Sequence, residues 1–164
     1  MRSQTNFKAL QTTKKGTAGE TIVKAIFEGQ GWVMYEPATD SAHLVDFIGF
    51  HPDKGLLSIE TKSYPRRACC NDTGIDKPDF DKYRELWTDH NMRTCLIFCD
   101  PFEQMIYGAY LDAIEQTAHM EGSKVYFPLS VLKPIRRMNP AEVAAIGAVS
   151  DRYQDVKPFF AGCK

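Results

Sequence analysis

The fold is decided by two strand-like runs, LVDFIGF (44–50) and LLSIETKSY (56–64), and by the segment between them, HPDKG (51–55). The first run is almost wholly apolar, and the second alternates apolar with polar residues, which is typical of β-strands. The Pro, Asp and Gly of the connecting segment are typical of a hairpin turn. The sequence therefore predicts that the two runs pair as neighbouring strands.

Charged residues stand at related places on these two runs. Side chains alternate between the two faces of a strand, so Glu60 and Lys62 share one face of the second run. Asp46 is a lone charge inside the apolar first run, and a hairpin can bring it near Glu60. Two carboxylates and one ammonium group then meet on one surface of the sheet.

This combination of charges has a chemical use. Two like charges held close together are unfavourable unless a cation lies between them. Mg²⁺ binds oxygen ligands and bridges to phosphate groups, and a neighbouring ammonium group can stabilise the charge that develops on a phosphate. Asp46, Glu60 and Lys62 therefore predict metal-dependent hydrolysis of a phosphodiester. The alternative is a solvent-facing strand with a Glu–Lys pair, which contributes little to stability and does not explain the lone Asp46.

A helix is predicted upstream, over about residues 17–29. Its apolar residues recur at helical spacing: Ile22, Val23, Ile26 and Phe27. Thr17 followed by Glu20 matches a capping box, and Glu20 also lies at the edge of the buried stripe. Gly16 and Gly19 would let this end of the helix approach the sheet closely. Glu20 is therefore a fourth candidate for the site, the alternative being that it only caps the helix.

The rest of the chain completes an α/β pattern. Before the hairpin we expect an N-terminal arm (1–16) and a strand (31–38). After it we expect a loop (65–78), a helix (79–90) and two strands (93–100 and 105–111). The chain then continues with a short helix (112–121), an extended segment (124–138) and a helix that Asn139-Pro140 opens and that runs to about Asp155. The order α-β-β-β-α-β-β predicts one mixed α/β domain over residues 1–164. Its core would span about 16–112, with a C-terminal helical extension over 113–164.

Three motifs together resemble those of a known enzyme group. The pattern G-x-x-x-E over 16–20, V-D-F-I over 45–48 and E-T-K over 60–62 resembles the PD-(D/E)XK nuclease superfamily, which includes restriction enzymes, Holliday junction resolvases and phage exonucleases. The resemblance covers about residues 16–112. It implies a restriction-endonuclease-like core, which is a mixed central β-sheet flanked by helices.

The resemblance also implies roles for individual residues. Asp46 corresponds to the metal-binding aspartate, Glu60 to the second carboxylate, Lys62 to the catalytic lysine and Glu20 to a helix glutamate found in many members. The carbonyl of Thr61 stands where such enzymes often offer one more metal ligand. The chain departs from the pattern in that a valine, and not proline, precedes the aspartate.

Candidate contacts to nucleic acid are basic residues near these motifs. Arg66 and Arg67 follow the second run directly, Lys14 and Lys15 precede the first helix, and Lys82 lies early in the second helix. Such side chains can bind the phosphates that flank a scissile bond. The alternative for each is a solvated surface residue.

Composition restricts the class of protein. The formal net charge is −1 over 164 residues, so any positive charge that attracts nucleic acid must be local. The five cysteines are odd in number and form no C-x-x-C motif, which argues against a disulfide framework and a zinc ribbon. The N-terminus has no apolar run of a secretory signal, and no stretch reaches the roughly 18 apolar residues of a membrane helix. We therefore expect reduced thiols and a cytoplasmic location.

The sequence thus predicts a metal-dependent DNA endonuclease that uses Mg²⁺ or Mn²⁺ and acts as a homodimer. A resolvase-like or phage-type enzyme is the leading subclass. The alternative is a catalytically silent protein with a nuclease fold, which binds nucleic acid or regulates or inhibits a partner. The intact Asp46, Glu60 and Lys62 argue against this alternative, whereas the slightly acidic net charge favours it.

Overall fold

The structure is a computed structural model that describes residues 11–37, 43–67 and 70–147, with only the backbone for 11–15. Its helices and strands are α1 (Gln11–Gly29), β1 (Val33–Tyr35), β2 (Phe47–His51), β3 (Gly55–Lys62), β4 (Asp72–Asp76), α2 (Lys77–Thr88), β5 (Thr94–Asp100), β6 (Met105–Tyr110), α3 (Leu111–Ile114), β7 (His119–Glu121), β8 (Lys124–Pro128), β9 (Lys133–Arg137) and α4 (Pro140–Gly147). Short 3₁₀ turns follow α3 and β8. None of the described helices is long and apolar enough to cross a membrane.

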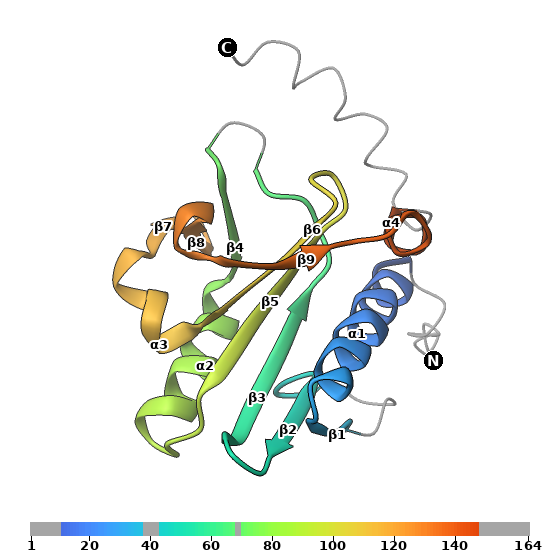
Figure 1. Ribbon diagram of the computed structural model, residues 1–164. Coiled ribbons are helices and arrows are strands. Elements are labelled where there is room, and N and C mark those ends of the chain that lie inside the picture. The colour runs from blue at the N-terminus through green and yellow to red at the C-terminus, as the bar shows by residue number, and fades with distance from the viewer. Residues whose placement is uncertain (1–10, 38–42, 68–69, 148–164) are drawn as a thin grey trace, which may run out of the picture.

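In the described part of the chain, two sheets and four α-helices build the fold. The large sheet has the strand order β1-β2-β3-β5-β6-β9, in which β3 and β5 pair in parallel and the other neighbours are antiparallel. A smaller antiparallel sheet has the order β4-β8-β7. Figure 1 shows α1 and α4 on one side of the large sheet, and α2, α3 and the small sheet on the other. The predicted mixed α/β architecture is confirmed.

Strand β5 is the centre of this arrangement, since all seven of its residues are buried. Cys95, Ile97 and Cys99 pack into the core on the α1 side of the sheet. Leu96 and Phe98 pack into a second core on the α2 side. The apolar run of β5 is continuous because both faces of this strand are buried, as predicted. The two cysteines are core residues, as their shared face suggests.

The predicted hairpin is also confirmed. Strands β2 and β3 pair from Phe47 opposite Ile59 to His51 opposite Gly55, which has a φ of 77° that glycine adopts easily. The first predicted strand is shorter than its run, because β2 begins at Phe47. Asp46 therefore directly precedes the strand, at the level of Glu60 on its neighbour.

The N-terminal half of α1 differs from the prediction. The helix begins at Gln11 and not near Thr17, so the predicted capping box is wrong. Thr17 lies inside the helix, and its carbonyl accepts a hydrogen bond of 2.8 Å from the Thr21 hydroxyl. The preceding Gln, Thr and Lys residues can all be helical, and one internal glycine costs only about 1 kcal/mol. The predicted helix end is confirmed at Gly29, followed by Gly31 with a φ of 87°.

The segment predicted as a loop over 65–78 contains strand β4, so that prediction is wrong. Its sequence, DTGID, has a single apolar side chain, Ile75, and shows no alternation. The strand exists because its backbone pairs with β8, where Gly74 lies opposite Tyr126. Helix α2 then begins at Lys77, slightly earlier than predicted.

The C-terminal segment is not only helical, although it was predicted as a helical extension. After α3 it forms β7, β8 and β9, and β9 adds an edge strand to the large sheet. The predicted start of α4 is confirmed, because the Glu142 amide donates to Asn139 Oδ1 at 2.9 Å and the Asn139 amide donates to Glu142 Oε2 at 2.8 Å. The predicted end near Asp155 lies outside the described residues.

The close pairing of β4 with β8 can be tested with Gly74→Ala. A Cβ at this position would lie 2.4 Å from the Val125 carbonyl oxygen and 2.7 Å from Tyr126 Cδ1. Because backbone must shift to admit it, we expect a loss of about 1–3 kcal/mol in the free energy of unfolding, measured by urea denaturation. Gly29→Ala is the matched control, since a Cβ there would meet no atom within 4 Å. Equal stability of the two variants would contradict the packing of β4.

Candidate active site

The two faces of β3 serve different purposes. Leu57 and Ile59 pack into the core on the α1 side. Glu60 and Lys62 lie on the opposite face and approach α2. The predicted alternation therefore holds, and it delivers one carboxylate and one ammonium group to the same side of the sheet.

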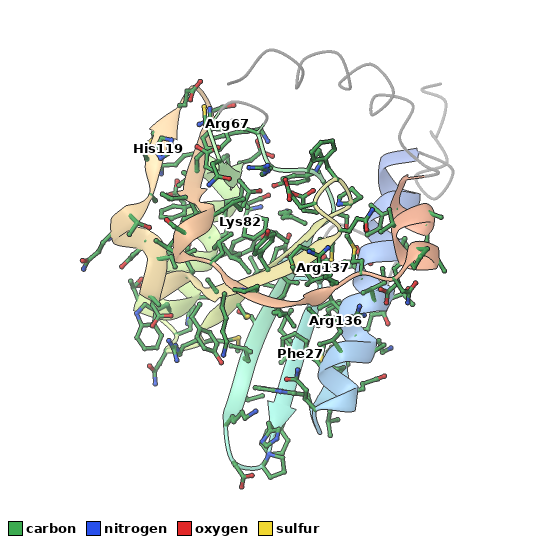
Figure 2. All side chains as sticks on the ribbon, turned by 45° about the horizontal axis from the view of Figure 1, so that its top comes forward. Phe27, Arg67, Lys82, His119, Arg136 and Arg137 are labelled. Atoms are coloured by element: carbon green, nitrogen blue, oxygen red, sulfur yellow. The ribbon has the colours of Figure 1, made fainter. Side chains whose placement is uncertain are left out.

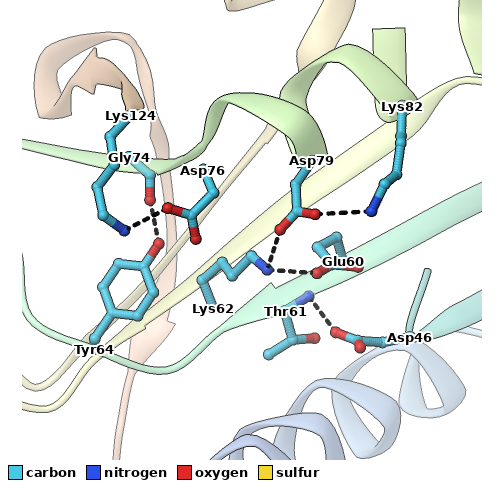
Figure 3. Close-up of polar contacts among 10 residues, drawn as sticks. All are labelled: Asp46, Glu60, Thr61, Lys62, Tyr64, Gly74, Asp76, Asp79, Lys82 and Lys124. Carbon is cyan, nitrogen blue, oxygen red and sulfur yellow. Dashed lines mark hydrogen bonds and ion pairs between the residues drawn. The ribbon is translucent and has the colours of Figure 1, made fainter. Parts of the chain in front are cut away.

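Glu60 and Lys62 form a partly buried ion pair. Lys62 Nζ donates to Glu60 Oε1 at 2.7 Å, and Glu60 as a whole residue is only 6% exposed. Lys62 Nζ also lies 3.6 Å from Asp79 Oδ2 of α2, and the other oxygen of Asp79 accepts from Lys82 Nζ at 3.1 Å. Figure 3 shows Asp79 between the two lysines.

These carboxylates determine the charge of Lys62. Burial by itself lowers the pKa of Lys62, but the charge and hydrogen bond of Glu60, together with the charges of Asp79 and Asp46, raise it above its ordinary value. Lys62 is therefore a fixed cation at neutral pH. This state suits an electrostatic role better than that of a general base.

Asp46 is held against the same stretch of β3. Its Oδ2 accepts a hydrogen bond of 2.7 Å from the backbone amide of Thr61, the residue between Glu60 and Lys62 (Figure 3). Burial, and then the charge of Glu60, raise the pKa of Asp46 to about 8, against the lowering effect of the Thr61 amide. Two carboxylates thus lie close enough to repel each other.

Glu20 reaches this group from α1. Burial raises its pKa, and the charges of Glu36 and Glu60 raise it further, whereas those of His43 and Lys62 lower it. The helix comes close to β3 at Gly19, where a Cβ would lie 1.8 Å from Ser63 Oγ, so the predicted role of Gly19 is confirmed. The same role for Gly16 is wrong, because a Cβ there would meet only Glu20 Oε1, at 3.3 Å.

The donor groups fit a divalent cation in chemistry, though not in their present arrangement. In the described part of the chain, no group of three or more His, Cys, Asp or Glu side chains is arranged to hold a metal. Lys62 and the Thr61 amide engage the oxygens of Glu60 and Asp46. Carboxylate oxygens are nevertheless the ligands that Mg²⁺ prefers, and a cation would relieve the repulsion between Glu60 and Asp46, which after burial is the second cause of the raised pKa of Asp46. Ligation of such an ion by Asp46, Glu60, Glu20 and the Thr61 carbonyl stays a prediction for all four.

Two of the residues predicted to contact nucleic acid are the arginines that follow β3. Arg66 forms an ion pair with Glu103, and Arg67 donates two hydrogen bonds of 2.6 Å to Asp72. Arg67 also lies over the ring of Tyr126, at 3.7 Å from its centre. It lies beside His119, as Figure 2 shows. Both arginines therefore already have partners within the chain. A role in binding phosphate stays a prediction for each.

Three lysines complete this set of candidates. Lys82 is half exposed on α2 and shares Asp79 with Lys62. The backbone of Lys14 and Lys15 is part of α1, but the structure does not describe their side chains. Contacts of these lysines with nucleic acid also stay predictions.

Two residues near the site were missed by the sequence analysis. Asp79 pairs with Lys62, and Tyr83 is only 2% exposed. Burial raises the pKa of Tyr83, and the charge and hydrogen bonding of Glu60 raise it further. The spacing of four residues between Asp79 and Tyr83 on α2 puts them on one helix face. This spacing could have indicated that both side chains face the site. A charged residue in the first turn of a helix is, however, equally typical of a solvated position.

Comparisons with known proteins bear on the fold. No protein-family model and no curated protein matches the chain. Among solved structures, the chain is similar to Hjc from Archaeoglobus fulgidus, a Holliday junction resolvase from an archaeal hyperthermophile. The TM-score is 0.55 at 13% sequence identity, over 74% of this chain and 92% of that chain. The likeness shows the restriction-endonuclease-like fold that the motifs implied: a mixed central sheet flanked by helices.

The burial of Asp46 and its repulsion by Glu60 together predict a pH dependence of stability. A carboxyl group whose pKa rises from 3.8 to about 8 on folding binds its proton more tightly in the folded chain, so the free energy of unfolding falls as pH rises through this window. Asp46→Asn should remove that loss and make the metal-free protein more stable than the wild type at pH 8, but not at pH 4. Urea denaturation in EDTA at both pH values measures this difference. Asp53→Asn, in the exposed hairpin turn, is the control, and a wild type as stable as Asp46→Asn at pH 8 would contradict the prediction.

Proposed function

We propose that this chain is a divalent-metal-dependent DNA endonuclease that hydrolyses phosphodiester bonds at the surface formed by Asp46, Glu60 and Lys62. One observation carries the proposal: Lys62 Nζ lies 2.7 Å from Glu60 Oε1, while Asp46 accepts a hydrogen bond from the backbone amide of Thr61, the residue between them. Two carboxylates and a fixed cation are the groups that metal-assisted phosphodiester hydrolysis requires. The restriction-endonuclease-like fold supports this proposal.

The proposed roles follow from the charges of the residues. Asp46 and Glu60 hold Mg²⁺ or Mn²⁺, which when bound supplies Lewis acidity at the scissile phosphate. Lys62 has only donors, so it binds a phosphate oxygen and stabilises the negative charge that develops there. Glu20, at the edge of the group, accepts hydrogen bonds from solvent or serves as a further ligand.

The substrate and assembly are also proposed. We take DNA as the substrate, with a four-way junction as the first structure to test, because a similar solved structure is that of a Holliday junction resolvase. A symmetric branched substrate suits a homodimer that presents two identical sites. The net charge of −1 requires local contacts, for which Lys14, Lys15, Arg66, Arg67 and Lys82 are the candidates.

A second candidate function is a catalytically silent protein with the same fold that binds nucleic acid or regulates a partner. It is favoured by the arrangement of the side chains as they stand, in which the described residues form no three-membered metal-ligand group. In this case Lys62 neutralises Glu60 permanently and no metal enters.

Cleavage of a DNA panel separates the two candidates. We expect the purified protein to cut linear, circular or four-way-junction DNA in Mg²⁺ or Mn²⁺, and to be inactive in EDTA, because the carboxylates need a cation to act together. Denaturing gels of end-labelled substrates measure this activity. Binding without cleavage of any DNA or RNA, in every divalent metal, would favour the silent protein.

Substitutions separate the roles of Lys62 and Glu60. Lys62→Ala should lower the cleavage rate on the order of 10²–10³-fold, because one positioned electrostatic contact is lost. Its DNA affinity in Ca²⁺ should persist, because affinity depends on many phosphate contacts. Glu60→Ala should lower both the rate and the stabilisation by Mn²⁺. Time courses, gel-shift titrations and melting temperatures measure the three quantities.

A matched control keeps this test specific. Lys133→Ala removes an exposed lysine of β9 and should change none of the three quantities. Cleavage by Lys62→Ala at the wild-type rate would remove this lysine from the mechanism. Stabilisation of Glu60→Ala by Mn²⁺ to the wild-type extent would place the metal elsewhere.

A further inference from the structure

Helix α2 contributes two side chains to the candidate site, and each contacts one member of the β3 pair. We propose that Asp79 and Tyr83 are positioning residues, which hold Lys62 and Glu60 in the geometry that cleavage requires. This inference rests on the proposed nuclease function. It assigns a role to α2, which none of the three motifs includes.

The first step of the argument is a match of spacings. Asp79 and Tyr83 are four residues apart and share one helix face, while Glu60 and Lys62 are two residues apart and share one strand face. Asp79 lies 3.6 Å from Lys62, and Tyr83 is buried where, after burial, the charge and hydrogen bonding of Glu60 raise its pKa. The helix face therefore meets the strand face through a measured ion pair and a buried phenol that is subject to the second carboxylate.

The second step concerns what happens to Lys62 when a cation binds. In the structure, the shortest contact of Lys62 Nζ is with Glu60 Oε1, at 2.7 Å. A divalent cation on Glu60 would compete for that carboxylate and repel the ammonium group. Asp79, 3.6 Å away, then remains as a partner that keeps Lys62 beside the phosphate. Without Asp79, the flexible side chain of Lys62 would lose its orientation.

The third step is that Asp79 is itself held in place. It lies in the first turn of α2, where a carboxylate is favoured by the helix dipole. Its other oxygen accepts from Lys82, so one carboxylate serves two cations. An oriented Asp79 can therefore orient Lys62; Figure 3 shows the contacts of Asp79 with both lysines.

The fourth step concerns Tyr83. Its ring is buried in the core on the α2 side of the sheet, which fixes the phenol oxygen. A buried tyrosine hydroxyl requires a partner, and after burial it is Glu60, by its charge and hydrogen bonding, that raises the pKa of Tyr83 most. Hydrogen bonds from such neighbours orient metal-binding carboxylates, and their loss typically costs about 10–100-fold in metal affinity or activity.

The experiment compares Asp79→Asn and Tyr83→Phe with matched controls. Asp81→Asn removes an exposed carboxylate of the same helix that pairs with Lys77, and Tyr107→Phe trims a tyrosine packed against the same core. Each variant is measured for its single-turnover cleavage rate in Mn²⁺, its DNA dissociation constant in Ca²⁺, and its gain in melting temperature with Mn²⁺.

We expect Asp79→Asn to cleave about 10–100-fold more slowly with unchanged DNA affinity and an unchanged Mn²⁺ gain, since Lys62 is no ligand. Asp79→Glu should recover part of the rate, because it restores the charge. Tyr83→Phe should lower both the rate and the Mn²⁺ gain. The controls should behave as the wild type.

The outcomes distinguish this inference from the proposed function. A wild type that cleaves while Asp79→Asn and Tyr83→Phe match their controls would overturn the inference alone. A wild type that cleaves nothing would overturn the proposed function. In that case the Mn²⁺ gain still decides the role of Tyr83, because a gain in Tyr83→Phe equal to that of the wild type would overturn it.

Discussion

The carboxylates of Asp46 and Glu60 lie beside each other, partly buried, where the β2–β3 hairpin meets α2. Burial raises the pKa of Asp46, the charge of Glu60 raises it further, and this repulsion must be met by other groups. The Thr61 amide donates to Asp46, and Lys62 donates to Glu60. Further from the strand, Asp79 and Lys82 continue the alternation of negative and positive charges. The electrostatic organisation of this surface follows from the need to keep two carboxylates together.

The core explains how the chain holds these groups in place. Strand β5 is buried on both faces and pairs in parallel with β3, from Ser58 opposite Thr94 to Lys62 opposite Phe98. Closely packed interiors resist displacement, so the end of β3 is rigid. On one side α1 approaches at Gly19, and on the other α2 is anchored by Tyr83 and Leu86. The candidate site is thus built mainly on regular elements, which hold side chains more precisely than loops.

The sequence predicted those parts in which local pattern and burial agree. The apolar run of β5 predicted a buried strand, and residues 51–55 predicted a hairpin turn. The lone Asp46 in an apolar run predicted a functional residue. Strand β4 was missed because DTGID becomes a strand only through pairing with β8, which is distant in sequence. The capping box at Thr17 was wrong because the helix continues through Gly16 to Gln11. Asp79 could not be distinguished from a solvated helix residue until the position of α2 over β3 was known.

The central claim is that Asp46 and Glu60 form a metal site whose occupation leaves Lys62 beside it. Anomalous diffraction from crystals soaked in Mn²⁺ tests this claim most directly, because it locates the ion and the side chains together. The account predicts an anomalous peak within coordination distance of oxygens of both Asp46 and Glu60, with Lys62 Nζ still paired to Asp79. A peak at other residues, or no peak while Lys62 remains bound to Glu60, would contradict it.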